Sequence, residues 1–164
     1  MSRARVPPGP GQESVWDYPR PPRVEDCPKP VTITFNGVVI ADTRRAKRVL
    51  ETSHPPVYYI PRADIRPDAL VPSRRSSFCE FKGRAGYVSV RVGDKLAEDV
   101  GWFYPDPAAG FEPIRDHVAF YAGPMDACTV GGEVVTPQPG GFYGGWVTAD
   151  VFGPFKGGPG TAGW

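Results

Sequence analysis

Three tight-turn signals, each placed between apolar runs of period two, constrain the fold of this chain more than any other feature. A pair such as Asn-Gly accommodates the positive φ angles that both central residues of a two-residue hairpin turn require. The predicted turns are Asn36-Gly37, Gly93-Asp94 and Gly131-Gly132. Alternating apolar and polar residues on both sides of such turns form antiparallel strands, because successive side chains point to opposite faces. The sequence therefore predicts a mainly β protein built from antiparallel hairpins.

The length and the distribution of proline and glycine predict one compact domain with an extension at each end. The 164 residues suffice for one hydrophobic core and are too few for two domains. Residues 1–30 are rich in proline and predict an extended arm, in which Trp16 and Tyr18 dock on the domain. Residues 31–137 form the predicted β domain. Residues 138–164 are rich in glycine but also in aromatic residues, so an ordered segment packed on the domain is expected.

Few short helices are expected. Residues 42–51 are predicted to form one, with Asp42 or Thr43 as its N-terminal cap. The other predicted elements are a strand at 57–60 stopped by Pro61, a short helical turn at 62–65, a short turn at 111–115, and a strand at 117–121.

The second hairpin carries the most detailed prediction. The pairs expected from a two-residue loop are Val92 with Lys95, Ser89 with Glu98, Tyr87 with Val100 and Ala85 with Trp102. The face predicted to meet the core carries Val88, Val90, Val92, Ala97 and Phe103. The other face mixes aromatic and ionisable side chains, which is unlike an ordinary solvent-exposed face. Its residues are Tyr87, Ser89, Arg91, Glu98, Trp102 and Tyr104.

Charge and cysteine content exclude several classes of function. A formal net charge of +1 indicates neither nucleic acid nor an acidic membrane as the main partner. Cys27, Cys79 and Cys128 include no Cys-x-x-Cys pair, and the two histidines are not at metal-ligand spacing. The glycine-rich end matches no phosphate-binding motif, so no cofactor and no metal are expected. Because the sequence shows neither a signal peptide nor an apolar run of ~20 residues, a reduced, cytoplasmic protein is expected.

Cys79 and Lys82 are the first candidates for chemistry. A thiolate becomes a better nucleophile when a neighbouring ammonium lowers the pKa of the thiol. On an extended backbone the two side chains point to opposite faces, so they meet only if Glu80-Phe81 turns. The alternative is that Cys79 is a buried free thiol and that Lys82 is a turn charge or a ligand-binding cation.

Glu98 and His54 are the other catalytic candidates. The aromatic face predicted around Glu98 raises the pKa of a carboxyl group and suits it to proton transfer, and a salt bridge to Arg91 is the alternative. His54 precedes the rigid pair Pro55-Pro56, which could hold its imidazole as a general base. A histidine that caps the preceding turn or bonds a backbone carbonyl is the alternative.

These observations favour a protein that binds a small organic ligand. One face of the sheet is expected to form an aromatic-lined cleft, with His54 and Lys82 at its polar rim. The predicted ligand-binding residues are Lys82, Tyr58, Tyr59, Tyr87, Trp102 and Tyr104. The first alternative is an enzyme that uses Cys79 or Glu98 with help from Lys82 and His54. The second is a structural or assembly protein whose aromatic arms dock between the subunits of a homodimer.

Several stretches within roughly residues 31–125 together resemble the bacterial and fungal family filed as domain of unknown function 427, sometimes labelled nucleotidyltransferase-like. The most specific are His54-Pro55-Pro56-Val57-Tyr58-Tyr59-Ile60-Pro61 and Cys79-Glu80-Phe81-Lys82-Gly83. The resemblance implies a bacterial protein with a small fold similar to the β-tent class, and no established activity. The chain lacks the Gly-Ser and Asp-x-Asp elements that a nucleotidyltransferase needs for its metal ions, so the label finds no support in its motifs. It also lacks the Cys-x-x-Cys knuckles through which many β-tent proteins hold zinc.

Overall fold

The structure, a computed structural model, describes residues 12–164. The described chain is mainly β, as predicted, and its only helices are single 3-10 turns. These turns are η1 (Val15–Asp17), η2 (Arg62–Asp64), η3 (Pro67–Ala69) and η4 (Glu112–Ile114). The beginning of the predicted proline-rich arm, residues 1–11, lies outside the described residues. Within residues 12–164, no helix has the length and the apolar composition needed to cross a membrane.

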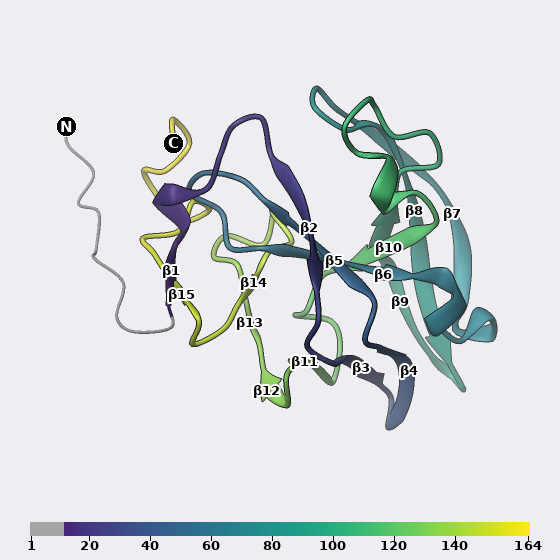
Figure 1. Ribbon diagram of the computed structural model, residues 1–164. Coiled ribbons are helices and arrows are strands. Elements are labelled where there is room, and N and C mark those ends of the chain that lie inside the picture. The colour runs from purple at the N-terminus through teal and green to yellow at the C-terminus, as the bar shows by residue number, and fades with distance from the viewer. Residues whose placement is uncertain (1–11) are drawn as a thin grey trace.

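Two antiparallel sheets form the body of the molecule (Figure 1). The larger sheet has the spatial order β2 (Arg23–Cys27), β5 (Ala46–Leu50), β6 (Val57–Pro61), β10 (His117–Phe120), β9 (Lys95–Phe103), β8 (Gly83–Val92) and β7 (Leu70–Cys79). The smaller sheet has the order β12 (Glu133–Val134), β11 (Ala127–Val130), β3 (Val31–Phe35) and β4 (Val38–Thr43). All three predicted hairpins are present: β3 with β4, β8 with β9, and β11 with β12. In the first turn, Asn36 and Gly37 have the positive φ angles that the turn requires, 48° and 76°.

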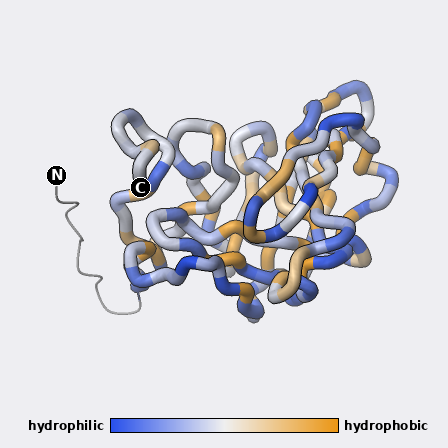
Figure 2. Tube along the Cα trace, turned by 90° about the horizontal axis from the view of Figure 1, so that it is seen from above, coloured by the Kyte–Doolittle hydropathy of each residue, from blue (hydrophilic) through white to orange (hydrophobic). Residues whose placement is uncertain are grey.

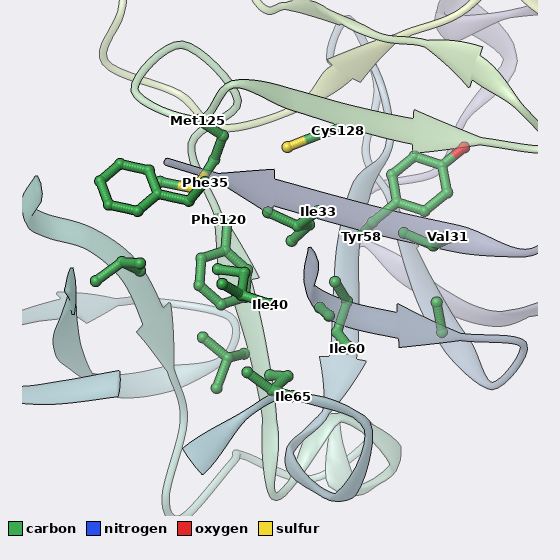
Figure 3. Packing of buried hydrophobic residues seen from close by; sticks show 14 of the residues in the cluster. Val31, Ile33, Phe35, Ile40, Tyr58, Ile60, Ile65, Phe120, Met125 and Cys128 are labelled. Carbon is green, nitrogen blue, oxygen red and sulfur yellow. The ribbon is translucent and has the colours of Figure 1, made fainter. Parts of the chain in front are cut away.

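The main hydrophobic core lies between the two sheets. Side chains from alternate positions of β6 and β10 enter it, so that Tyr58, Val118 and Phe120 are core residues while Tyr59 and Ala119 point to the other face. Figure 2 shows short hydrophobic and hydrophilic stretches that follow one another along the chain. Figure 3 shows a part of this core, with Val31, Ile33, Phe35, Ile40, Tyr58, Ile60, Ile65, Phe120, Met125 and Cys128 labelled.

The opposite face of the larger sheet carries a second hydrophobic cluster, which we call the outer aromatic cluster. Strands β5, β6, β8, β9 and β10 supply most of it, and the segment after β9, which includes η4, packs on them. Its buried residues are Val49, Tyr59, Ala85, Tyr87, Trp102, Tyr104, Phe111, Ile114 and Ala119. The larger sheet is therefore covered on both faces.

The two ends of the described chain pack together beside the sheets (Figure 1). β1 (Glu13–Ser14) pairs in parallel with β15 (Val151–Phe152), and Tyr18 is buried in the same region, as predicted for the arm. β13 (Thr136–Pro137) pairs with β14 (Trp146–Val147), whose Trp146 is fully buried in the main core. Residues 12–30 and 138–164 therefore pack on the domain, and β2 of the arm forms an edge of the larger sheet.

The predicted helix at 42–51 is wrong. Residues up to Thr43 continue β4, and β5 follows directly and pairs with both β2 and β6. The hydroxyl of Thr43 accepts a hydrogen bond from the backbone N–H of Arg45 at 2.9 Å, which lies in the bend and not in a helix. The same hydroxyl donates to the carboxylate of Asp64 at 2.6 Å. The cap-like residues thus stabilise a tight bend between two strands.

The register predicted for the second hairpin is correct near its turn and wrong beyond it. Val92 pairs with Lys95 as expected, but a bulge in β9 then shifts the pairing, so that Tyr87 faces Trp102. Asp99 lies in this bulge with a φ of 53°, and its N–H donates to the Ser89 hydroxyl at 3.0 Å.

Candidate functional site

Four of the six predicted ligand-binding residues lie in the outer aromatic cluster. Tyr59, Tyr87, Trp102 and Tyr104 come from β6, β8 and the end of β9, and each is less than a tenth exposed. The indole N–H of Trp102 donates to the Tyr59 hydroxyl at 3.3 Å, and the rings of Tyr59 and Tyr104 lie 6.3 Å apart. Burial raises the pKa of Tyr59 and Tyr104, so both phenols stay protonated. These rings form a packed wall.

Tyr58 does not belong to this wall. It points to the opposite face of β6, where its ring stacks on Trp146 with 5.2 Å between ring centres. Burial raises the pKa of its hydroxyl to about 12. Because neighbouring residues of a strand face opposite ways, the adjacent Tyr58 and Tyr59 could not both line one face.

Cys79 and Lys82 lie on the two sides of the turn between β7 and β8. Residues 80–82 form this turn, and Cys79 pairs with Gly83, so the extended backbone considered for this segment is replaced by a bend. Cys79 is partly buried against the outer aromatic cluster. The ammonium nitrogen of Lys82 lies 5.8 Å from the ring centre of Tyr104 and 6.0 Å from that of Phe111. Both side chains thus reach the same cluster from one turn.

Two further cations rest on aromatic rings near this face. The Arg75 guanidinium lies 4.6 Å from the ring centre of Tyr87, and the Lys156 ammonium lies 5.4 Å from that of Tyr143. We call Arg75, Lys82 and Lys156 the ring-bound cations. Among residues 12–164, none of the three has a carboxylate oxygen within 4.0 Å.

The C-terminal segment borders the cluster at Trp102. A Cβ added to Gly144 would lie 2.0 Å from the Trp102 ring, so the backbone there rests directly on the indole. The ring of Tyr121 lies 4.8 Å from that of Trp102, and the Tyr121 hydroxyl donates to the carbonyl of Phe142 at 3.0 Å. The residues around the cluster that keep partial exposure include Phe81, Lys82, Tyr121 and Tyr143.

His54 is held as a neutral imidazole by the C-terminal segment. The N–H of Gly145 donates to Oε1 of Gln138 at 3.1 Å, so the amide nitrogen of Gln138 faces His54 and donates to its Nδ1 at 3.0 Å. The ring proton is therefore on Nε2, which lies 3.6 Å from the carboxylate of Glu51. The ring also packs edge-on against Tyr143, at 4.7 Å. Both nitrogens have partners.

One carboxylate and three cations act on His54. Burial lowers the pKa of His54 to about 4, Glu51 raises it, and Lys156, Arg20 and Lys82 each lower it by less than burial does. Lys82 and His54, both predicted at the rim of the site, thus influence one another electrostatically.

The three catalytic candidates do not converge. Glu98 is exposed next to the bulge of β9. No hydrogen bond or ion pair within residues 12–164 joins Glu98, His54 and Cys79. In the same range, no three His, Cys, Asp or Glu side chains are grouped so that they could hold a metal ion.

A second charged region lies where the arm meets the C-terminal segment, and we call it the arm junction. It encloses a cavity of about 230 Å³. Arg48 donates there to Glu25 and, at 3.2 Å, to Glu13, while Lys29 pairs with Asp150. The residues that line the cavity are Glu13, Glu25, Asp26, Cys27, Pro28, Lys29, Arg48, Tyr58 and Asp150. Both cations that line it are thus paired with carboxylates.

A comparison with known protein families shows which part of this site lies within a family domain. The family model described as Domain of unknown function (DUF427), with the label NTP_transf_9, matches residues 23–131. The chain belongs to this family. The match runs from β2 to the turn after β11 and includes Cys79, Lys82 and the outer aromatic cluster, whereas Tyr143 and Lys156 lie outside it. No curated protein matches the chain.

Sequence reasoning missed four residues at this face: Arg75, Tyr121, Tyr143 and Lys156. Tyr121 could have been predicted, because it lies two residues after Ala119 in a predicted strand and therefore shares its face. The others lie in an edge strand and in an irregular segment, where no periodicity indicates direction.

Proposed function

We propose that this protein binds a small organic ligand at the partly exposed border of the outer aromatic cluster. The observation that carries the proposal is the position of Lys82, a half-buried residue whose ammonium lies about 6 Å from two aromatic ring centres and has no carboxylate oxygen within 4.0 Å in the described chain. Charges removed from water are normally paired, because an unpaired buried charge is unfavourable. An ammonium in this position is therefore available to a ligand.

The surroundings of Lys82 support the same proposal. Small-molecule sites are mostly apolar and carry a few polar groups that fix the orientation of the ligand. Phe81, Tyr121 and Tyr143 offer partly exposed rings, and Trp102 and Tyr104 stiffen the wall behind them. Because the wall is packed before any ligand arrives, binding does not need to order these side chains.

A thermal-shift screen of the full chain against a metabolite panel tests the proposal. A true ligand raises Tm, and the substitution Phe81→Ala weakens its binding at least about tenfold by removing contact area. Phe78→Ala is the matched control, because Phe78 belongs to the same hairpin but is 77% exposed. A panel without any stabilising compound contradicts the proposal, and so does a ligand that binds both variants as tightly as the unmodified chain.

A further inference from the structure

The charges of this face specify the class of ligand, an inference that rests on the function proposed above. We infer that the ligand is an anion with a flat conjugated ring, either an aromatic carboxylate or an aromatic phosphate ester. Its negative group lies at Lys82, and its ring lies against the partly exposed rings of Phe81, Tyr121 and Tyr143.

The first argument is the contrast between the ring-bound cations and two cations that have carboxylate partners, Lys95 and Arg45. Lys95 also lies over a ring, that of Phe35 at 5.0 Å, but it has the carboxylate of Asp126 at 3.9 Å. Arg45 is paired with Asp64 at 2.9 Å. On the outer face, Arg75, Lys82 and Lys156 have rings but no such partner among residues 12–164. The negative charge that would balance them is supplied by no described residue.

The second argument is the local field of the lysines. Lys156 and Lys82 both lower the pKa of His54, while Glu51, which raises it, is paired with Arg20 at 3.3 Å. Because Lys82 and Lys156 have no carboxylate partner among residues 12–164, an anion that approaches them is attracted. Lys82 belongs both to this field and to the aromatic border.

The third argument is the relative strength of the contacts. An ammonium over a ring is attracted by the negative face of the π system, but a hydrogen bond to an anionic oxygen is stronger. A carboxylate or phosphate can therefore take one or more of the three ammonium donors of Lys82 without separating it from Tyr104 and Phe111. Rings of a ligand and of the protein then pack edge to face or offset, as aromatic pairs prefer.

Calorimetry with matched pairs of compounds tests the inference on the full chain. The pairs are 2-naphthoate with 2-naphthamide and 2-naphthyl phosphate with 2-naphthol, so that each anion has a neutral counterpart of the same ring. We expect at least one anion to bind about tenfold or more tightly than its counterpart, and the first and second pairs distinguish carboxylate from phosphate. Lys82→Gln should abolish the difference. Lys95→Gln, the matched lysine over a ring, should preserve it.

The outcomes separate the inference from the function on which it rests. Equal binding of anions and neutral counterparts overturns the anion inference and leaves ligand binding at this face in place. An anion preference that survives Lys82→Gln also overturns it, because the negative group then lies elsewhere. Failure of all four compounds to bind overturns the inference, and if the metabolite screen is negative as well, the proposed function fails with it.

Discussion

The outer aromatic cluster and the arm junction both contain partly buried cations, but they balance them in opposite ways. At the arm junction, Arg48 and Lys29 each meet carboxylates, and these pairs connect β5 and the arm to each other and to the C-terminal segment. At the outer aromatic cluster, Lys82 meets only rings. The difference teaches that a cavity and a cluster of charges do not by themselves indicate a binding site. The paired charges connect parts of the fold, whereas we propose that the unpaired ones bind a ligand.

The two regions also differ in their relation to the family. The outer aromatic cluster and Lys82 lie within the matched residues 23–131, whereas Glu13 and Asp150 of the arm junction lie outside them. The wall of the proposed site thus belongs to the family domain. The arm junction belongs in part to the extensions that this chain adds to it.

The largest expected effect concerns the buried imidazole of His54. Its pKa of about 4 in the folded state is below the value near 6.5 of an unfolded chain, so the unfolded state binds more protons between these pH values. Stability should therefore fall by about 3 kcal/mol as the pH falls from 6.5 to 4. The charged groups that face His54 are Glu51, Lys156, Arg20 and Lys82.

Urea unfolding at several pH values checks this, with His54→Gln as the variant that should lose most of the dependence. Because burial also lowers the pKa of His117, His117→Gln is the necessary control and should keep the part due to His54. A pH profile of His54→Gln identical to that of the unmodified chain would contradict the assignment.

The second prediction tests whether the paired and unpaired cations contribute differently to the free energy of unfolding. Arg48→Met should lower the free energy of unfolding by about 2 kcal/mol, because it removes the half-buried cation that Glu25 and Glu13 share. Lys82→Met should change it by less than about 0.5 kcal/mol, since no ion pair is lost. Urea denaturation measures both. Equal losses would remove the distinction between the two regions.

The third prediction concerns the contact between the C-terminal segment and Trp102. Gly144→Ala should destabilise the protein by about 1–3 kcal/mol, because a methyl group would overlap the indole ring. Gly158→Ala, in the same segment, places its methyl group in open space and should be close to neutral. Chemical denaturation followed by tryptophan fluorescence reports both stability and the environment of the indole. A neutral Gly144→Ala would show that the segment does not rest on Trp102.

The fourth prediction concerns reactivity and not stability. It compares how fast the three thiols of the folded chain are modified. Burial raises the pKa of Cys27 and raises that of Cys128 to about 12, and both are at most 3% exposed. Cys79, in contrast, is only partly buried. Mass spectrometry of the folded chain treated with methyl methanethiosulfonate should therefore find Cys79 modified first. Earlier modification of Cys27 would mean that the arm junction opens more easily than the outer face.

Much of the fold follows from local chemistry that the sequence displays. The turn at Asn36-Gly37 located one hairpin, and alternation placed Tyr87 and Trp102 on one face. The bulge at Asp99 was not predictable, because it depends on hydrogen bonds to Ser73 on β7 and Ser89 on β8. Its consequence is the changed register, in which Tyr87 faces Trp102 and not Val100.

The strands that sequence reasoning missed are those whose stability comes from partners rather than from their own pattern. β5 has Lys47 and Arg48 at its centre and resembles a capped helix, yet pairing with β2 and β6 makes it a strand. β7 contains Pro72 and two arginines, which is typical of an edge strand protected against further pairing. Because Arg75 lies in β7, and Tyr143 and Lys156 lie in an irregular segment, those parts of the candidate site were not predictable.

The most direct test of the central claim, that the ligand occupies the outer aromatic cluster and not the arm junction, compares Cys79 with Cys27 in one experiment. Cys79 borders the proposed site, and Cys27 lines the cavity of the arm junction. The rate of modification of each thiol by methyl methanethiosulfonate is measured with and without the tightest-binding naphthyl anion at ten times its Kd. The account predicts that the anion slows modification of Cys79 roughly tenfold and leaves Cys27 unchanged. An anion that protects Cys27 and not Cys79 would contradict it.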